Sequence, residues 1–307
     1  MKGRLTQLLP RVTDRPLDWR LASLVFTLGA LVLADLYLLR SLALSWYPTD
    51  WLNYVEAGNR AWASEPIYAP APGYAFPYSP LAAYAFGALA PLGHDGWAWL
   101  HVAAALLLPW PMGLFVLPLY PFWWDVATGN VIIFQLLAAA WALRGKNWAI
   151  GSYLITAVLI PRPLTLPLTF YLLWRHSAWR GPFAGILGLS LVGAAMTSQM
   201  DAWIAASARQ SGDMTSIWNS APSQLIGWFW IPIGLALATW LTFRGRVGLA
   251  SLAASPYWLP YYLLFVLLDW QGLRTGHRTN FVPLQPHHES GAAVDRVRVE
   301  VSSADPR

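Results

Sequence analysis

Long apolar segments follow one another through most of this chain of 307 residues and constrain its fold more than any other feature. A helix needs about 20 apolar residues to cross the hydrocarbon core of a bilayer. Only 11% of the residues are charged, against about 25% in a typical soluble domain. The pattern predicts an all-α polytopic membrane protein with about seven to nine transmembrane or re-entrant helices. The apolar segments are 21–45, 78–92, 97–119, 129–143, 148–174, 183–199, 224–243 and 247–268.

Composition excludes several other classes of protein. The chain has 20 tryptophans, a residue that gathers at the interface between a membrane and water. The net charge of +5 comes from basic residues scattered at the ends of apolar segments, so we expect no nucleic-acid partner. The chain has no cysteine, which excludes a disulfide framework, a thiolate metal site and a cysteine nucleophile.

Lysine and arginine predict the orientation, because connections rich in these residues stay in the cytoplasm. Residues 1–20 are rich in Lys and Arg and lack the apolar core of a cleavable signal peptide, whereas 46–77 holds only Arg60. We therefore expect a multi-pass protein of the plasma (inner) membrane. It would have a cytoplasmic arm at 1–20, a transmembrane domain over 21–268 with an outward loop at 46–77, and a disordered polar tail at 269–307. The other basic connections are 144–146, 175–180 and 244–246, and the other connections poor in basic residues are 120–128 and 200–223.

Segment 148–174 is basic at both ends, so both ends are expected in the cytoplasm. Two full spans need about 40 residues, more than this segment has. Pro161 and Pro163 flank Arg162, and prolines remove backbone donors and stop a helix. The pattern favours a hairpin of two half-length helices broken at these prolines, and a single tilted span is the alternative.

The outward loop at 46–77 contains a candidate catalytic acid. After Pro48 and Thr49, the residues Asp50, Tyr54 and Ala57/Gly58 recur at helical spacing, so one face would carry a carboxylate, an aromatic hydroxyl and a small residue. A carboxylate beside aromatic rings at a membrane surface can act as a general base. Alternatively, Asp50 only caps the helix by accepting from free backbone N–H groups.

Arg162 is a cation inside an apolar segment, where it costs about 3 kcal/mol on insertion scales. Its planar guanidinium can bind a phosphate through two parallel hydrogen bonds. The alternative is a structural ion pair with Asp35, which also lies inside a predicted span. Asp35 can instead pair with Arg40 on its own segment.

Other polar and aromatic residues interrupt apolar stretches. Tyr78 ends an aromatic, proline-rich stretch that suits either sugar binding or an interfacial belt. Asn130 follows Gly129 at the start of a span, Asn219 lies in an outward connection, and Trp258 lies in a segment broken by prolines. These residues can bind substrate, or they can hold helices together. The chain has no pair of adjacent aspartates and no nucleotide-binding or zinc-hydrolase motif, so we expect no metal and no cofactor.

In their order and spacing, these motifs resemble the family-87 glycosyltransferases. That family is described as a domain of unknown function related to the mannosyltransferases that depend on polyprenyl-phosphate mannose. The family has the GT-C architecture, and the resemblance covers about residues 45–265. Arg162 stands where the family more often has lysine, Ser79 replaces a proline, and the chain is shorter at its C-terminal end. The matching stretches are Asp50–Trp51 with Tyr54 and Ala57, Glu65–Tyr68, Pro77–Pro80, Gly129–Asn130, Arg162–Pro163 with Pro167, and Ser255–Trp258.

The resemblance implies a GT-C-like helical bundle that transfers a sugar, a mannose-like hexose, from a polyprenyl-phosphate donor. The acceptor would be a lipid or a glycan on the extracytoplasmic face. Asp50 would be the catalytic base and Arg162 would bind the donor phosphate. The other expected substrate-binding residues are Tyr54, Tyr78, Asn130, Asn219 and Trp258. The competing interpretations are a transporter or flippase for a lipid-linked sugar, and a non-catalytic subunit of the same fold.

Overall fold

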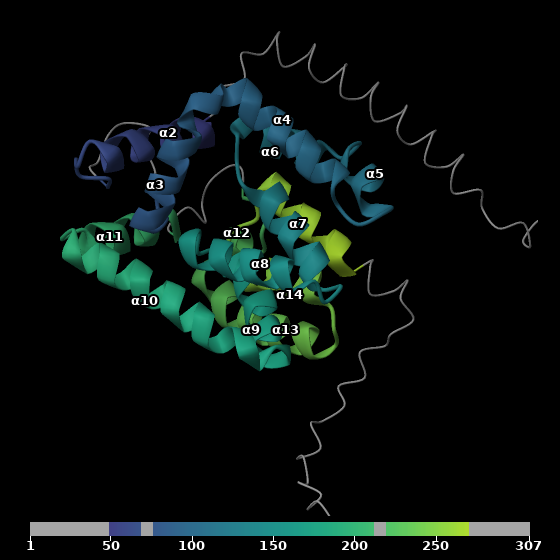
Figure 1. Cartoon of the computed structure of the whole chain (residues 1–307). Helices are drawn as coiled ribbons and strands as arrows, with labels where there is room; N and C mark the ends of the chain where they lie inside the picture. Colours follow the sequence, from purple (N-terminus) through teal and green to yellow (C-terminus); the bar gives the residue numbers. More distant parts are fainter. Residues whose placement is uncertain (1–48, 69–75, 212–218, 270–307) are drawn as a thin grey trace, which may run out of the picture.

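The computed structural model describes residues 49–68, 76–211 and 219–269 (Figure 1). Within these ranges every regular element is a helix and no strand occurs, so the all-α class is confirmed for the described part of the chain. The expected arm at 1–20, the first apolar segment at 21–45 and residues 270–307 of the expected tail lie outside the described residues. The same holds for Asp35 and Arg40.

The chain forms helices of very different lengths. The first are α2 (Thr49–Trp62), α3 (Pro80–Leu89), η1 (Ala90–Leu92), α4 (Gly93–Leu106), α5 (Met112–Val116), α6 (Tyr120–Thr128) and α7 (Ile132–Ala142). The next are α8 (Asn147–Leu159), η2 (Pro163–Thr165), α9 (Leu166–Arg175), η3 (Ser177–Trp179), α10 (Arg180–Met196) and α11 (Met200–Ser211). The last are α12 (Ser223–Ile226), η5 (Gly227–Phe229), α13 (Trp230–Phe243), α14 (Val247–Ala254) and η6 (Pro260–Val266).

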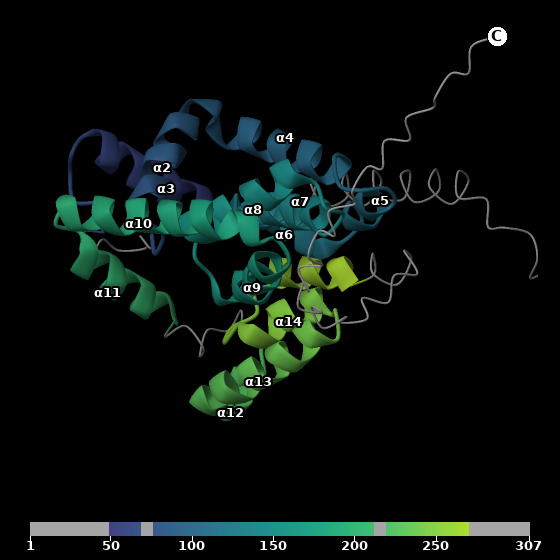
Figure 2. The ribbon, with the colours of Figure 1, turned by 60° about the horizontal axis from the view of Figure 1, so that its bottom comes forward.

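One helix within the described residues, Ser223–Phe243, is long and apolar enough to cross a bilayer. Its mean hydropathy is 1.6, and 17% of its apolar window is buried. The pair Ser177–Met196 and Met200–Ala208 would be a second span if its two parts are counted together, but the pair is bent by 111°. Figure 2 shows α11 leaving the end of α10 in a different direction. Helix lengths alone therefore support fewer spans than the sequence predicts.

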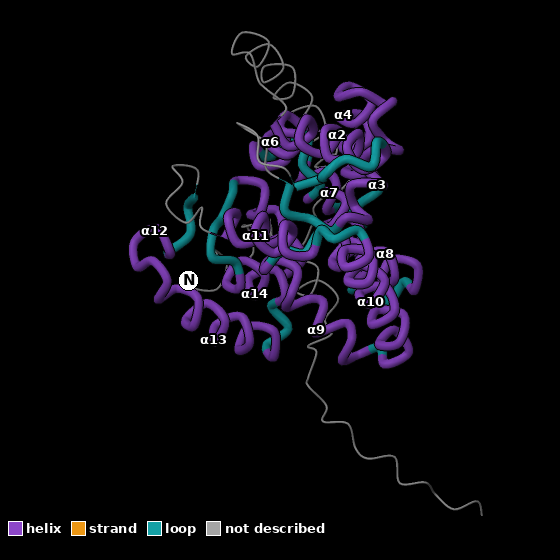
Figure 3. The backbone as a smooth tube through the Cα atoms, turned by 90° about the vertical axis from the view of Figure 1, so that its left-hand side faces the viewer, coloured by secondary structure: helices purple, strands orange, loops and turns teal. Residues whose placement is uncertain are grey.

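Several apolar segments of the sequence are divided into shorter helices. Segment 97–119 divides into α4 and α5, because Pro109 and Pro111 lie between them and lack the N–H group that a helix requires. The connections expected at 120–128 and 200–223 contain the helices α6 and α11. Segment 247–268 divides into α14 and η6 around Ser255–Leu259, as its prolines predict. Figure 3 shows the chain as short helices in purple joined by loops in teal.

Segment 148–174 forms the predicted hairpin. Helix α8 ends at Leu159, the backbone of Arg162 is extended, and α9 begins at Leu166. The open ends lie together, because a Cβ atom added to Gly151 in α8 would be 2.6 Å from the ring of Trp179, just after α9. Tyr153 also donates its hydroxyl to the Thr165 carbonyl at 3.0 Å. The chain reverses here, so a single tilted span is wrong.

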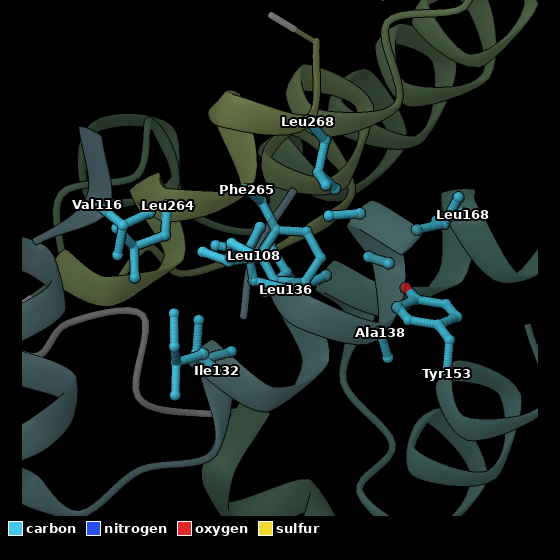
Figure 4. Packing of buried hydrophobic residues seen from close by; sticks show 14 of the residues in the cluster. Leu108, Val116, Ile132, Leu136, Ala138, Tyr153, Leu168, Leu264, Phe265 and Leu268 are labelled. Carbon is cyan, nitrogen blue, oxygen red and sulfur yellow. The ribbon is translucent and has the colours of Figure 1, made fainter. Parts of the chain in front are cut away.

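The apolar core joins the middle of the chain to its last helix. Figure 4 shows Ile132 and Leu136 of α7 with Leu264 and Phe265 of η6, all of them buried. Burying side chains of this size stabilises a fold by about 2 kcal/mol each relative to exposure to water. Because this core fixes η6 against α7, the tyrosines at the start of η6 lie next to the residues that precede α7.

The prediction that the disordered tail begins at residue 269 is wrong for that residue. Asp269 is buried, and its carboxylate accepts hydrogen bonds from the N–H groups of Gly248 and Leu249, at 2.8 and 2.9 Å. These N–H groups belong to the first turn of α14, where helices have free donors. Asp269 thus caps the N-terminus of α14 from a distant position in the chain.

Candidate functional site

Asn130 lies at the centre of a cluster of the predicted site residues, between α6 and α7. Its amide Nδ2 donates to Asp50 Oδ2 at 2.6 Å and to the Tyr261 hydroxyl at 3.0 Å. Its Oδ1 accepts from Arg162 Nη2 at 3.0 Å. Only this orientation of the amide gives a donor to the carboxylate and an acceptor to the guanidinium. Asn130 therefore joins the predicted base to the predicted phosphate-binding cation.

Gly129 makes this arrangement sterically possible. It ends α6 in the left-handed region at φ +71°, which glycine adopts without strain. A Cβ atom at Gly129 would lie 2.5 Å from Cβ of Trp51, the neighbour of Asp50. The Gly129 carbonyl accepts from the indole Nε1 of Trp97 at 2.8 Å. The missing side chain thus lets the start of α2 approach the loop that carries Asn130.

Asp50 is the second residue of α2, so it lies inside the helix rather than at the N-cap position. The hydrogen bond from Asn130 holds its half-buried carboxylate. Burial raises the pKa of Asp50, while the bond from Asn130 and the charge of Arg162 act in the opposite direction. A carboxylate with a raised pKa in a polar cluster is a stronger base than an exposed aspartate, as general-base catalysis requires.

Arg162 lies at the tip of the hairpin and is 3% exposed. It donates from Nη2 to the Tyr78 hydroxyl and to Asn130, and its guanidinium carbon is 5.2 Å from the ring centre of Tyr78 and 5.7 Å from that of Tyr262. In the described part of the chain its Nε and Nη1 have no hydrogen-bond partner. A buried guanidinium with two free donor nitrogens fits an anionic ligand, because such groups are otherwise costly to bury.

Tyrosines of the outward loop pack around Tyr78, which contacts this cation. The hydroxyls of Tyr54 and Tyr78 are 3.4 Å apart, and the Tyr54 ring stacks on Phe86 with 4.3 Å between ring centres. Tyr68 donates to the Tyr78 carbonyl at 2.6 Å. Tyr54 follows Asp50 by one turn on the same face of α2, as the helical spacing predicts.

Ser79, which departs from the family pattern, connects the hairpin to α3. Its N–H donates to the Leu159 carbonyl at 3.0 Å, and its hydroxyl accepts from the N–H of Ala82 at 3.3 Å. A proline at position 79 would have neither donor nor hydroxyl. The serine therefore ties the start of α3 to the hairpin tip that carries Arg162.

Two predicted site residues, Asn219 and Trp258, bond to each other and to neighbouring residues rather than to this cluster. Asn219 Oδ1 accepts from the N–H of Trp258 at 2.9 Å, and its Nδ2 donates to Ser223 at 3.1 Å. The indole of Trp258 donates to the Leu252 carbonyl at 2.7 Å. These bonds hold the broken segment to the start of α12, and a role in substrate binding stays a prediction.

Sequence reasoning missed Tyr261 and Tyr262. Tyr261 contacts Asn130 and Tyr262 contacts Arg162, in the place where the sequence predicts Trp258. The one sign of them in the sequence is the tyrosine pair after Pro260. Because the helix is broken at 255–259, helical spacing does not predict which aromatic residue faces the site. Among the described residues, no group of three histidine or acidic side chains could hold a metal ion. The expectation of chemistry without a metal stays a prediction.

No protein-family model, curated protein or solved structure matches this chain. In its described residues the chain is all-helical, and its site is a carboxylate–amide–guanidinium cluster in which Asn130 and Arg162 are buried and Asp50 is half-buried.

Proposed function

We propose that this protein is a membrane glycosyltransferase of the GT-C type. It transfers a mannose-like hexose from a polyprenyl-phosphate donor to a lipid or glycan acceptor on the extracytoplasmic face. The observation that carries the proposal is the bridge by Asn130 between the Asp50 carboxylate and Arg162, whose Nε and Nη1 have no partner in the described residues. A base and an anion-binding cation at one amide suit transfer from a phosphate leaving group.

The reaction divides between these two side chains. Asp50 takes the proton of the acceptor hydroxyl, and the hydroxyl oxygen attacks the anomeric carbon of the sugar. The bond from this carbon to the phosphate oxygen breaks, and the phosphate leaves with the electron pair. Arg162 stabilises the charge that develops on the phosphate through its free donors. Asn130 keeps base and cation in a fixed relation, which lowers the entropy lost on reaching the transition state.

A multi-pass placement in the plasma membrane is part of the proposal. Large apolar side chains are exposed along the described helices, including Met196 at 82%, Phe229 at 76% and Leu225 at 90%. A protein surrounded by water rarely exposes apolar surface of this extent, whereas lipid accepts it. Arg144 lies over the Trp141 ring and Arg244 over the Trp240 ring, at 5.5 and 5.2 Å, a pairing typical of a membrane interface.

Contacts between distant segments support the proposed orientation. Two connections expected to face outward, 46–77 and 200–223, meet where Trp203 Nε1 and the Ser207 hydroxyl donate to the Pro77 carbonyl at 3.0 and 2.9 Å. The Asp50–Asn130 bond joins the outward loop at 46–77 to the end of α6. Gly151 and Trp179 lie together near two connections expected in the cytoplasm. Arg162, at the hairpin tip, then points away from the cytoplasmic ends of α8 and α9.

The test is a transfer assay in membranes that contain the protein, with radiolabelled polyprenyl-phosphate sugars as donors. We expect transfer by the wild-type protein and a loss on the order of 10²- to 10⁴-fold for Asp50→Asn. Glu56→Gln is the matched control, because Glu56 is an exposed acid on the same helix that pairs with Arg60 at 2.7 Å.

The alternatives give different results in this assay. A transporter would move the labelled lipid across the membrane without breaking the sugar–phosphate bond. A non-catalytic subunit would do neither with any donor. Equal transfer by wild type and Asp50→Asn would contradict the assignment of the base.

A further inference from the structure

His101 and Asp125 form a buried pair beside Asn130 that the transfer chemistry does not use. His101 belongs to α4 and Asp125 to α6, and both side chains are fully buried. The ring nitrogen Nε2 of His101 lies 3.7 Å from Asp125 Oδ2. Asn130 links this pair to the proposed base and cation, because His101 contacts Asn130 and Asn130 contacts both of them.

Both ring nitrogens of His101 face backbone carbonyl oxygens. Nδ1 lies 2.8 Å from the Trp97 oxygen, and Nε2 lies 2.6 Å from the Asn130 oxygen. Carbonyl oxygens only accept, whereas a neutral imidazole has one donor and one acceptor nitrogen. A neutral ring would therefore direct a lone pair at an oxygen. Only the imidazolium donates on both sides, and the Asp125 carboxylate lies 3.7 Å from Nε2, close enough to balance that charge.

Asp125 holds the other side of the same loop. Its Oδ2 accepts from the N–H of Ile133 at 2.9 Å, and its main-chain oxygen accepts from the N–H of Asn130 at 3.0 Å. Asp50 and Arg162 are the other charged groups whose fields reach Asp125. The His101 ring thus bonds the carbonyl of Asn130, while the Asp125 carboxylate bonds the N–H of Ile133, three residues further along the same loop and helix start.

We propose that His101 and Asp125 form a buried ion pair that positions Asn130, and through it aligns Asp50 with Arg162. Both are positioning residues, since neither needs to touch the substrate. The side chains of the pair hold this loop at two points, the Asn130 carbonyl through His101 and the Ile133 N–H through Asp125, and the side chain of Asn130 then sets the relation of base to cation. The effect on catalysis rests on the proposed function, whereas the effect on the loop does not.

The first experiment reads the ring and the loop without any sugar transfer. In protein labelled with ¹⁵N in its six histidines, we expect His101 to have both ring nitrogens protonated near neutral pH. His101→Gln identifies its signals by their loss. Asn130–Val131 is the one Asn–Val pair in the sequence, so ¹³C-carbonyl asparagine with ¹⁵N-valine gives one correlated signal. We expect His101→Gln to shift that signal and His176→Gln, a change at a half-buried histidine on another segment, to leave it in place.

The second experiment is a double-mutant cycle on transfer. We expect His101→Gln and Asn130→Ala each to lower kcat on the order of 100-fold, because both misplace the same groups. The double variant should lose no more than the single ones, since the two changes act through one path. His101→Gln with Asp125→Asn removes the uncompensated buried carboxylate. It should recover the thermal stability lost in the single variant, but not kcat.

The outcomes separate the two proposals. A neutral His101 ring, an unmoved Asn130–Val131 signal, or multiplying losses in kcat would overturn the positioning role while leaving Asp50-dependent transfer intact. A charged ring and a shifted signal, together with no transfer from any donor, would support the pair and contradict the proposed function.

Discussion

The side-chain amide of Asn130 donates to the carboxylate of Asp50 at 2.6 Å, across 80 positions of sequence. The oxygen of the same amide accepts from Arg162 at 3.0 Å. One neutral side chain therefore separates the acid from the cation and bonds to both. In the described residues these two charges are not joined by a direct ion pair, as the proposed roles of Asp50 as base and Arg162 as anion-binding cation require.

Removing the bridge should impair transfer without unfolding the protein. Asn130→Ala removes the donor to Asp50 and the acceptor for Arg162, and we expect kcat/KM to fall on the order of 100-fold. Asn130→Asp should lose at least as much, because the new carboxylate repels Asp50 and pairs with Arg162. Transfer assays on purified variants check this, with Asn147→Ala at an exposed position as the control. Unchanged kcat/KM in both variants would refute the bridging role.

The pH dependence of transfer should report the ionisation of Asp50. Burial raises the pKa of this carboxyl, so the active, ionised form is lost as the pH falls through a value above the ordinary one. The charge of Arg162 acts against this rise, so Arg162→Gln should raise the pKa further and move the acid limb of kcat/KM to higher pH. Profiles measured from about pH 4 to about pH 8 check the direction. A limb that moves to lower pH would contradict it.

Arg162 should tolerate lysine better than glutamine. Lysine still binds phosphate as a point charge, so Arg162→Lys should keep partial activity, while Arg162→Gln should lose far more. Arg175→Gln at the exposed end of α9 is the control. If Arg162 instead balances Asp35, the Gln variant should misfold and Asp35→Asn should rescue it. Expression and thermal stability measured beside transfer distinguish the two roles.

Single cysteines should report the orientation, since the chain has none of its own. Ser64, Asn147 and Ser177 are exposed positions on opposite predicted sides of the membrane. We expect Ser64→Cys to react with an impermeant reagent in intact cells, and Asn147→Cys and Ser177→Cys to react only after the cells are opened. The reverse pattern would put Asp50 on the wrong side for the proposed chemistry.

Transfer should need no added divalent metal. In the proposed reaction Arg162 balances the charge on the leaving phosphate, and the sequence offers no pair of adjacent aspartates to hold a cation. Activity should therefore survive incubation with a chelator followed by its removal. Loss in the chelator that magnesium or manganese restores would sink this prediction.

Proline and helical spacing predicted the parts of the fold that depend on local chemistry. The break at Pro161–Pro163 and the face of α2 with Asp50 and Tyr54 follow from missing donors and from the turn of a helix. Helices α6 and α11 lie where the sequence predicts connections, because a lack of Lys and Arg indicates the side of the membrane and not the local structure.

Within the site, Asp50, Tyr54, Tyr78, Asn130 and Arg162 were predicted and come together. Tyr261 was missed because its approach depends on how η6 packs on α7, which is a tertiary effect. His101 and Asp125 were missed because a single histidine in an apolar helix has no local signal for a partner in another helix.

The contact of Tyr261 with Asn130 spans 131 positions, and Arg162 lies between them in the chain. A ribosome that makes this protein therefore completes the base, the amide and the cation long before it makes the last aromatic residues around them. Until η6 packs against α7, the surroundings of Arg162 are incomplete. Tyr261 and Tyr262 are thus the last residues around Asn130 and Arg162 to be synthesised, and a chain that stops before η6 lacks both contacts.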